Sequence, residues 1–190
     1  MAETQYSNLT ITKKDFTESH LPKGEYENCT FINCNFSNSS LANILFFECT
    51  FESCNLSLCN LNNTSFRDIV FENCKLLGLH FQHGNSFCFS IKLANCNLTH
   101  SSFYKLQLKK TIFNQCQLHE VDFSESDLTS AVFEQCDLLG AIFERTNLEK
   151  CDFRTSIHFN ISPDRNKLKK AKFSHLTIAG LLNEYGIIIE

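Results

Sequence analysis

The chain has 190 residues, 43% of them hydrophobic, and carries 17 Lys and Arg against 21 Asp and Glu, for a formal net charge of −4 at pH 7. This size fits one folded domain, and the mild acidity argues against direct binding of nucleic acid, for which a basic face is the usual footprint. No run approaches the roughly 20 apolar residues of a membrane span, and residues 1–16 lack the apolar core of a secretion signal. We therefore expect a cytoplasmic protein that does not associate with membranes.

From Ile11 to Phe81, every fifth residue is apolar or aromatic. A period of five fits neither a helix, where these positions would spiral around all faces, nor a strand, where they would alternate between two faces. The chain must therefore turn once in every repeat. The pattern is weakest at its start, where Lys14 occupies a position that elsewhere holds a small residue, so we expect a ragged first coil.

Cysteine supplies a second repeating position. Ten of the 11 cysteines lie two residues before a repeat centre, where the other occupants are mostly small or compact. Free cysteine packs as a small hydrophobic side chain, so we predict core thiols in a reducing compartment, with neither disulfides nor a metal site. Cys34, Cys54 and Cys74 recur every 20 residues. This recurrence predicts a coil of four repeats, stacked at the ~4.8 Å spacing of paired strands.

The repeat loses its phase once, between Phe81 and Leu98, which lie 17 residues apart where 15 would keep the phase. Two residues are therefore inserted, and Cys88 and Leu93 are expected to resume the repeat as centres. Gly and Asn accept the left-handed conformations of a tight turn. The predicted outward bulge consists of Gln82, His83, Gly84 and Asn85.

The second block of repeats, from Leu98 to Phe153, carries many acids. Residues 115–153 contain nine acidic and two basic residues, a net charge of −7, and none of the acids occupies an inward position. They do not recur every 20 residues, so we expect them to wind around the rod. The following residues, 154–172, carry a net charge of +5 and would partly neutralise this field at moderate salt. The nine acids are Glu120, Asp122, Glu125, Asp127, Glu134, Asp137, Glu144, Glu149 and Asp152.

After Phe153 the repeat fails, because His158 and Pro163 fall on centre positions. Residues 154–167 are predicted to form an irregular cap, followed by one more register that ends at Phe173. The repeat domain is thus expected to span residues 1–173, and residues 174–190 to form a separate C-terminal segment.

The C-terminal segment has the i, i+3, i+4, i+7 stripe of a short amphipathic α-helix, with Ser174 as N-cap and Gly186 as left-handed C-cap. A helix of about nine residues is not stable alone, so its apolar face must dock. It either plugs the end of the rod or joins two chains, and the apolar tail favours a symmetric dimer. The predicted dimer contacts are Ile178, Leu181, Leu182, Tyr185, Ile187, Ile188 and Ile189.

The repeat resembles that of the pentapeptide-repeat proteins: a small residue, Asp or Asn, Leu or Phe, a polar residue, and any residue. Residues 126–130, Ser-Asp-Leu-Thr-Ser, follow this pattern, and it extends from Ile11 to Phe173. The resemblance implies an all-β solenoid, a right-handed quadrilateral β-helix with its centres and small residues inside. Repeat physics agrees, because each coil buries its apolar face only against its neighbours.

The ending resembles one branch of that family, on residues 179–182 (Ala-Gly-Leu-Leu) and 185–189 (Tyr-Gly-Ile-Ile-Ile). This branch comprises the Qnr quinolone-resistance proteins, MfpA and the microcin-immunity protein McbG. The resemblance implies a C-terminally joined homodimer, similar to duplex DNA in size and charge, that binds DNA gyrase or topoisomerase IV and counters a poison of that enzyme. The looped Qnr proteins carry two extruded loops, whereas this chain has one two-residue insertion, so the poison stays open between a quinolone and a peptide toxin.

The sequence contains no phosphate-binding Gly loop, no HExxH and no GxSxG. His80, His83 and Cys88 match no standard spacing of metal ligands. We therefore expect no enzyme activity, no cofactor and no metal. The alternative function is a non-catalytic repeat scaffold for another protein partner, because a fold alone does not identify its partner.

Overall fold

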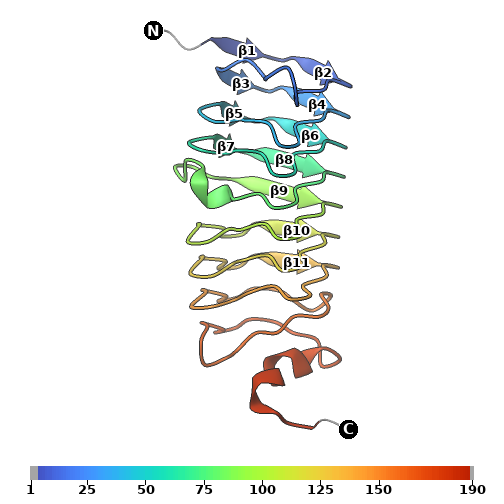
Figure 1. The fold of residues 1–190 in the computed structure, drawn as a ribbon. Coiled ribbons are helices and arrows are strands. Elements are labelled where there is room, and N and C mark those ends of the chain that lie inside the picture. Colours follow the sequence, from blue (N-terminus) through green and yellow to red (C-terminus); the bar gives the residue numbers. More distant parts are fainter. Residues whose placement is uncertain (1–3, 189–190) are drawn as a thin grey trace.

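In the computed structural model, residues 4–188 are described, and they wind into one rod of stacked coils (Figure 1). Each coil pairs in parallel with the next, and the partners lie 20 residues apart: Phe31 opposes Phe51, which opposes Phe71. Twenty residues are four repeats, so each coil has four sides. The predicted quadrilateral β-solenoid is confirmed. In this described part of the chain, no helix is long and apolar enough to cross a membrane.

The strands are short because the chain turns at every repeat. Residues 4–188 contain two parallel sheets, on adjacent sides of the rod, and the other two sides are joined by isolated bridges. The four-stranded sheet consists of β1 (Gln5–Ser7), β3 (Glu25–Glu27), β5 (Leu45–Phe47) and β7 (Ser65–Arg67). The seven-stranded sheet consists of β2 (Thr10–Thr12), β4 (Thr30–Ile32), β6 (Thr50–Glu52), β8 (Ile69–Glu72), β9 (Ile91–Ala94), β10 (Ile112–Asn114) and β11 (Val132–Glu134).

The repeat centres point inward and stack in columns. The ring of Phe51 stacks on those of Phe31 and Phe71, with centroids 4.8 and 5.2 Å away, close to the spacing of paired strands. Rings on adjacent sides meet edge to face, as Phe66 and Phe71 do at 5.8 Å and 75°, the geometry that aromatic quadrupoles favour. The spacing between coils therefore places the rings of each aromatic column at stacking distance.

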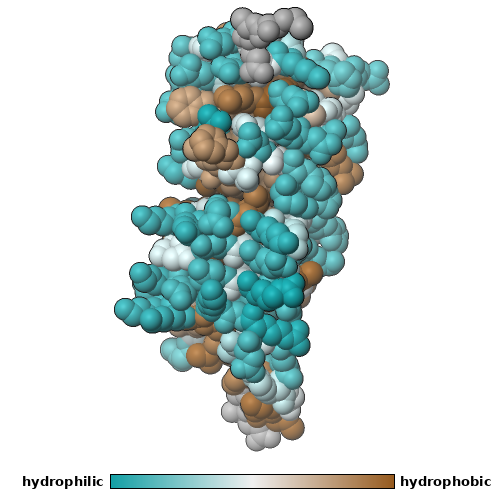
Figure 2. Space-filling model, turned by 90° about the vertical axis from the view of Figure 1, so that its left-hand side faces the viewer, coloured by the Kyte–Doolittle hydropathy of each residue, from teal (hydrophilic) through white to brown (hydrophobic). Residues whose placement is uncertain are grey.

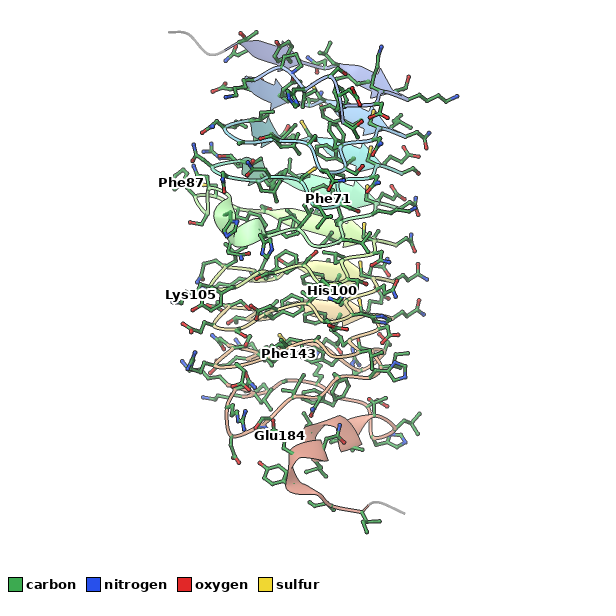
Figure 3. The ribbon with its side chains drawn as sticks, viewed as in Figure 1. Phe71, Phe87, His100, Lys105, Phe143 and Glu184 are labelled. Carbon is green, nitrogen blue, oxygen red and sulfur yellow. The ribbon has the colours of Figure 1, made fainter. Side chains whose placement is uncertain are left out.

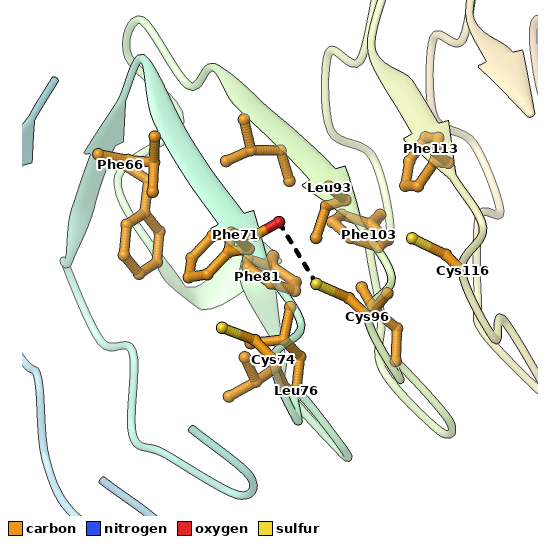
Figure 4. Packing of buried hydrophobic residues seen from close by; sticks show 14 of the residues in the cluster. Phe66, Phe71, Cys74, Leu76, Phe81, Leu93, Cys96, Phe103, Phe113 and Cys116 are labelled. Carbon is orange, nitrogen blue, oxygen red and sulfur yellow. Dashed lines mark hydrogen bonds between the residues drawn. The ribbon is translucent and has the colours of Figure 1, made fainter. Parts of the chain in front are cut away.

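The cysteines fill the core as predicted. Ten of the 11 are buried and all are free thiols. Their sulfur atoms approach backbone carbonyls of the preceding coil: Cys96 Sγ lies 3.4 Å from the Phe71 oxygen (Figure 4). Burial raises the pKa of Cys49 and of Cys59 to about 12. A thiol that stays protonated is neither a nucleophile nor a metal ligand, so these residues act as packing groups.

Most repeats turn through a left-handed residue two places after the centre. Asn73 has φ 54° and Lys150 has φ 60°. Such angles cost energy for most L-residues and least for Asn and Asp. Among the described residues, seven of these corners are Asn before residue 85, and none is Asn after residue 95. The two halves of the rod thus make the same turn with different side chains.

The two inserted residues lie later than the sequence predicted. Asn85 still bridges Ser65, 20 residues earlier, whereas Ile91 pairs with Ile69, 22 residues earlier. The insertion therefore falls within residues 86–90 and not within Gln82, His83, Gly84 and Asn85. Gln82 and His83 belong to a 3-10 turn, η1 (Phe81–His83), which is capped by Gly84.

Cys88 shows why the position of the insertion was misjudged. It was predicted to be an inward centre, but it is exposed with φ 57°, while Leu93 is buried as expected. The ring of Phe81 stacks on Phe103 at 4.6 Å, and Phe89 contacts Phe81 edge to face. These contacts hold the chain on both sides of the insertion, so the extra residues emerge at the exposed turn between them.

The C-terminal segment forms two 3-10 turns, η2 (Ile178–Leu181) and η3 (Asn183–Tyr185), so the predicted α-helix is wrong. Ser174 is not its N-cap: Thr177 precedes η2, and no side chain caps it. Gly186 does end η3 in the left-handed conformation. The reason lies in docking, because the Gly180 carbonyl accepts a hydrogen bond from Ile161 N–H at 3.0 Å instead of one from the next helical turn.

Candidate interaction surface

The nine acids predicted to contact a partner, here called the acidic belt, all lie on the outside of the rod, and none is buried. Asp122, Asp127, Asp137 and Asp152 each precede a repeat centre, and these four centres lie on four different sides. The belt therefore surrounds the rod and does not line one wall. Its members are Glu120, Asp122, Glu125, Asp127, Glu134, Asp137, Glu144, Glu149 and Asp152.

Within the described chain, four belt acids are neutralised by Lys or Arg from neighbouring positions. Glu125 lies 2.8 Å from Arg145 and 3.4 Å from Lys105, one coil to either side. Partial burial opposes ionisation of Glu125, but hydrogen bonds from Arg145 and Tyr104 and the charge of Lys105 outweigh it, so its pKa is lowered. The other three pairs are Asp127–Lys109 at 3.2 Å, Glu144–Arg165 at 2.9 Å and Asp152–Arg154 at 2.7 Å.

Two further belt acids contact only histidine. Glu120 lies 3.3 Å from His100, and Asp137 lies 2.9 Å from His119 and 2.8 Å from His158. A histidine supplies a counter-charge only when it is protonated. Among residues 4–188, these two carboxylates therefore have no Lys or Arg within ion-pair distance. The remaining three belt acids, which have no ion pair among residues 4–188, are Asp122, Glu134 and Glu149.

The structure also shows free acids that the sequence reasoning missed. All ion pairs of the described residues involve positions from 100 to 184, so the described acids of the earlier coils have no ion-pair partner. Glu52 and Glu72 lie directly opposite each other in β6 and β8. Their 20-residue spacing was the signal that could have identified them. The unpaired acids of this part are Asp15, Glu18, Glu25, Glu27, Glu48, Glu52, Asp68 and Glu72.

The predicted dimer residues divide between two roles. Leu181 packs against the core and, with the half-buried Leu182, helps to close the end of the rod. The others leave an apolar surface at the C-terminal tip, where Ile188 is 84% exposed. Ile189 lies outside the described residues. The exposed members are Ile178, Tyr185, Ile187 and Ile188.

The surface offers charge and shape more than reactive chemistry. Among residues 4–188, no group of three or more His, Cys, Asp or Glu is placed to hold a metal ion. Four of the seven histidines instead contact carboxylates or amides, as His80 does with the Gln82 side-chain amide at 3.2 Å. The arrangement is suited to binding another macromolecule through ion pairs.

The family model described as a pentapeptide repeat region matches residues 24–92 and 86–181. The chain belongs to the pentapeptide-repeat family. No curated protein sequence matches this pentapeptide-repeat protein.

Among solved structures, a trypsin-treated variant of QnrB1, a plasmid-mediated fluoroquinolone resistance protein, is 23% identical, with a TM-score of 0.50 over 98% of this chain and 100% of that one. HetL, a pentapeptide-repeat protein involved in heterocyst differentiation regulation from the cyanobacterium Nostoc sp. strain PCC 7120, is 14% identical, with a TM-score of 0.60 over 91% of this chain and 87% of that one. At these identities the likeness shows the fold of this pentapeptide-repeat protein, and its function has to be argued from its own surface.

Proposed function

We propose that this protein binds a type II topoisomerase, DNA gyrase or topoisomerase IV, as a mimic of duplex DNA, and so protects it from a quinolone or peptide toxin. The observation that carries the proposal is a set of outward carboxylates without a permanent counter-charge, distributed along the rod. A duplex-binding enzyme presents a positive surface, which such a rod would attract. These carboxylates are Asp15, Glu18, Glu25, Glu27, Glu48, Glu52, Asp68, Glu72, Glu120, Asp122, Glu134, Asp137 and Glu149.

The dimensions of the rod support the proposal. Eight steps of about 4.8 Å separate the coils of Ile11 and Phe173, so the rod is roughly 40 Å long. Two rods joined at their C-terminal tips would approach 80 Å, the length of roughly 23 base pairs. We propose that the exposed apolar residues at the tip form this joint in a homodimer. The proposal places the protein in the cytoplasm, where the topoisomerase acts on DNA.

The ion pairs of the acidic belt favour a second candidate function. Glu125 and Asp152 are held by this chain's own bases, and bound cations reduce the resemblance to a polyphosphate. A non-catalytic repeat scaffold that binds another protein partner would need no such resemblance. The two functions differ in whether a topoisomerase responds to the protein at all.

A supercoiling assay with purified DNA gyrase separates the two functions. In the presence of a quinolone or a peptide toxin, micromolar protein is expected to restore supercoiling, or to inhibit the enzyme directly. Neutralising three unpaired acids (Glu52→Gln, Glu72→Gln and Glu134→Gln) should weaken this effect about tenfold, because each removes an unscreened charge. The matched control neutralises three paired acids (Glu125→Gln, Asp127→Asn and Asp152→Asn) and should change it less. If the wild-type protein alters neither supercoiling nor poisoning, the topoisomerase proposal fails.

The dimer is tested separately by analytical ultracentrifugation. Ile188→Asp places a charge on the most exposed apolar residue of the tip and should convert dimers into monomers. Leu58→Asp changes an exposed leucine on the side of the rod and should leave the dimer intact. A monomeric wild-type protein at micromolar concentration would mean that the tip only caps the rod.

A further inference from the structure

Outward apolar side chains interrupt the polar surface of the early coils. Leu45 and Phe47 lie at the two ends of β5 and are half-buried, while Phe87, within the inserted residues, is 67% exposed. Arg67 pairs with Phe47 in the β5–β7 register, and its guanidinium carbon lies 5.3 Å from the centroid of the Phe87 ring. Phe87 projects from the left of Figure 3, the side that faces the viewer in Figure 2, where apolar atoms gather in the upper half. We call Leu45, Phe47, Arg67 and Phe87 the aromatic patch.

The fold does not require apolar residues at these positions. Glu25 and Glu27 occupy the places of Leu45 and Phe47 in the preceding coil, with the same strand register, and the solenoid forms equally well there. Exposed rings lose the free energy that burial would supply. Aromatic residues and Arg are the types enriched at the centres of protein interfaces. The composition of the patch is therefore that of a binding surface.

Acids surround the aromatic patch. Glu25 and Glu27 lie opposite Leu45 and Phe47 in the neighbouring strand β3, and these four residues and Arg67 line one shallow depression. Glu48 and Asp68 directly follow Phe47 and Arg67 along the chain. None of the four acids has an ion pair among residues 4–188. The surface thus has a centre of Leu45, Phe47 and Phe87 with the single cation of Arg67 against the Phe87 ring, and a rim of four acids.

The rim decides which kind of partner fits. A nucleic acid would bring phosphates against these carboxylates, and a second copy of this chain would bring the same acidic rim. Both arrangements place like charges together, which is costly at an interface. A segment with apolar side chains on one face and Lys or Arg beside them satisfies both the centre and the rim.

We propose that the aromatic patch docks a basic amphipathic segment of another protein. Its apolar side chains would cover Leu45, Phe47 and Phe87, and its cations would pair with the acidic rim. The patch lies in the early coils, far along the rod from the apolar C-terminal tip (Figure 1). This docking site goes beyond the proposed function, because it requires neither the dimer nor a topoisomerase.

The test uses a synthetic 18-residue helical peptide of Leu and Lys, with all Leu on one face, and fluorescence anisotropy with the full chain. Wild-type protein should bind it with a dissociation constant in the micromolar range that rises with salt. Phe47→Ser with Phe87→Ser should raise that constant about tenfold or more, since interface centres carry most of the binding energy. Leu58→Ser, which removes a leucine of 61% exposure elsewhere on the rod, is the matched control and should bind normally.

A charge variant and a charge-reversed peptide complete the test. Glu48→Lys should weaken binding without touching the apolar centre, so the test survives even if the double serine variant fails to fold. A Leu and Glu peptide should not bind. The inference is overturned if the wild-type protein fails to bind the Lys peptide, if Glu48→Lys binds as tightly as wild type, or if the Glu peptide binds equally well. Self-association of the wild-type protein that is lost in Glu48→Lys would instead identify a second copy as the occupant.

Discussion

The two halves of the rod, residues 5–85 and 91–173, share one core design and differ on the outside. In the N-terminal half, neighbouring coils are joined by side-chain amides: Asn28 Nδ2 donates to Asn8 Oδ1 at 2.6 Å, and Asn63 Nδ2 to Asn43 Oδ1 at 3.0 Å. In the C-terminal half, residues at these left-handed corners form ion pairs instead, as Glu125 does with Lys105 and Arg145. Among residues 4–188, ion pairs occur in the C-terminal half and the segment that follows it.

The number of acids in each half is a poor measure of its unpaired charge. The C-terminal half was selected from the sequence for its nine acids, yet Glu125 stands between Lys105 and Arg145 in successive coils. The N-terminal half has fewer acids, but Glu52 and Glu72 face each other without a cation. Residues 20 apart lie side by side in neighbouring coils, so opposite charges at this spacing attract each other and like charges repel each other. A basic partner of the kind proposed above would therefore neutralise more unpaired charge in the N-terminal half.

The largest expected effect tests the core that the halves share. Phe113→Ala removes a fully buried ring that stacks on Phe133 at 4.8 Å, and should lower the free energy of unfolding by about 3–5 kcal/mol. Because each coil contacts only its neighbours, hydrogen exchange should accelerate most in residues 93–133. Phe87→Ala, on the surface, is the control and should cost less than about 0.5 kcal/mol. Equal losses in both variants would contradict the inward assignment.

Gly180→Ala tests how the C-terminal half is closed. A Cβ at this position would lie 2.7 Å from Phe159 Cδ2 and would also meet the Phe159 carbonyl oxygen. The segment must then shift from the end of the core, at a cost of about 1–3 kcal/mol. Hydrogen exchange should increase near Phe159 and remain unchanged in the N-terminal half. Gly186→Ala is less suitable as a control because of its positive φ, so Ala179→Ser serves. Unchanged stability of Gly180→Ala would show that the segment is not docked.

Lys110→Gly tests the difference between the corners of the two halves. Lys110 is exposed with φ 61°, a conformation that costs an ordinary L-residue roughly 1–2 kcal/mol. Gly avoids this cost but loses more backbone entropy on folding, so only part of the cost is recovered as stability. The variant should be more stable by about 0.5–1 kcal/mol in chemical denaturation. Asn63→Gly should not increase the stability, since Asn tolerates the left-handed region and its amide donates to Asn43. Equal gains at both sites would mean that Asn has no advantage there.

Asp152→Asn tests the ion pairs of the C-terminal half. Asp152 lies 2.7 Å from Arg154 and 3.8 Å from Lys172. A partly exposed pair contributes less than about 1 kcal/mol to the free energy of unfolding and is screened by salt. The loss of stability in Asp152→Asn at low salt should therefore nearly vanish in 1 M salt. Glu72→Gln, in the N-terminal half, should be neutral or stabilising because it relieves the repulsion with Glu52. A loss for Asp152→Asn that is independent of salt would rule out an electrostatic origin.

The smallest expected effect is the pH dependence of that same pair. The hydrogen bond from Arg154 chiefly lowers the pKa of Asp152, so the folded state binds this proton less readily than the unfolded chain does. The stabilisation is therefore present above the ordinary pKa of about 4 and is lost as the pH falls through the lower folded value. The difference in unfolding free energy between wild type and Asp152→Asn should shrink from pH 5 to pH 2. A constant difference over that range would contradict the shift.

Sequence reasoning succeeded wherever a residue's role depends on its phase in the repeat. The inward columns of Phe and Cys, the four repeats per coil and the outward direction of the acids all follow from spacing, because one backbone conformation recurs in each repeat. It failed where the phase is broken. The insertion was placed at Gln82–Asn85, but the stacking of Phe81 on Phe103 holds that stretch in register and moves the extra residues to Phe87 and Cys88.

The rod follows from the amino-acid sequence alone, because a period of five with apolar centres can be buried only by a chain that turns at each repeat. The tertiary structure alone decided which charges are free. Ion pairing depends on side chains 20 or 21 residues apart meeting across coils, as Arg145 meets Glu125 and Arg165 meets Glu144. It also decided the form of the C-terminal segment, since the contact of Gly180 with the last coil outweighs the helical spacing of its apolar residues. Local spacing specifies this fold, and contacts between coils specify its surface.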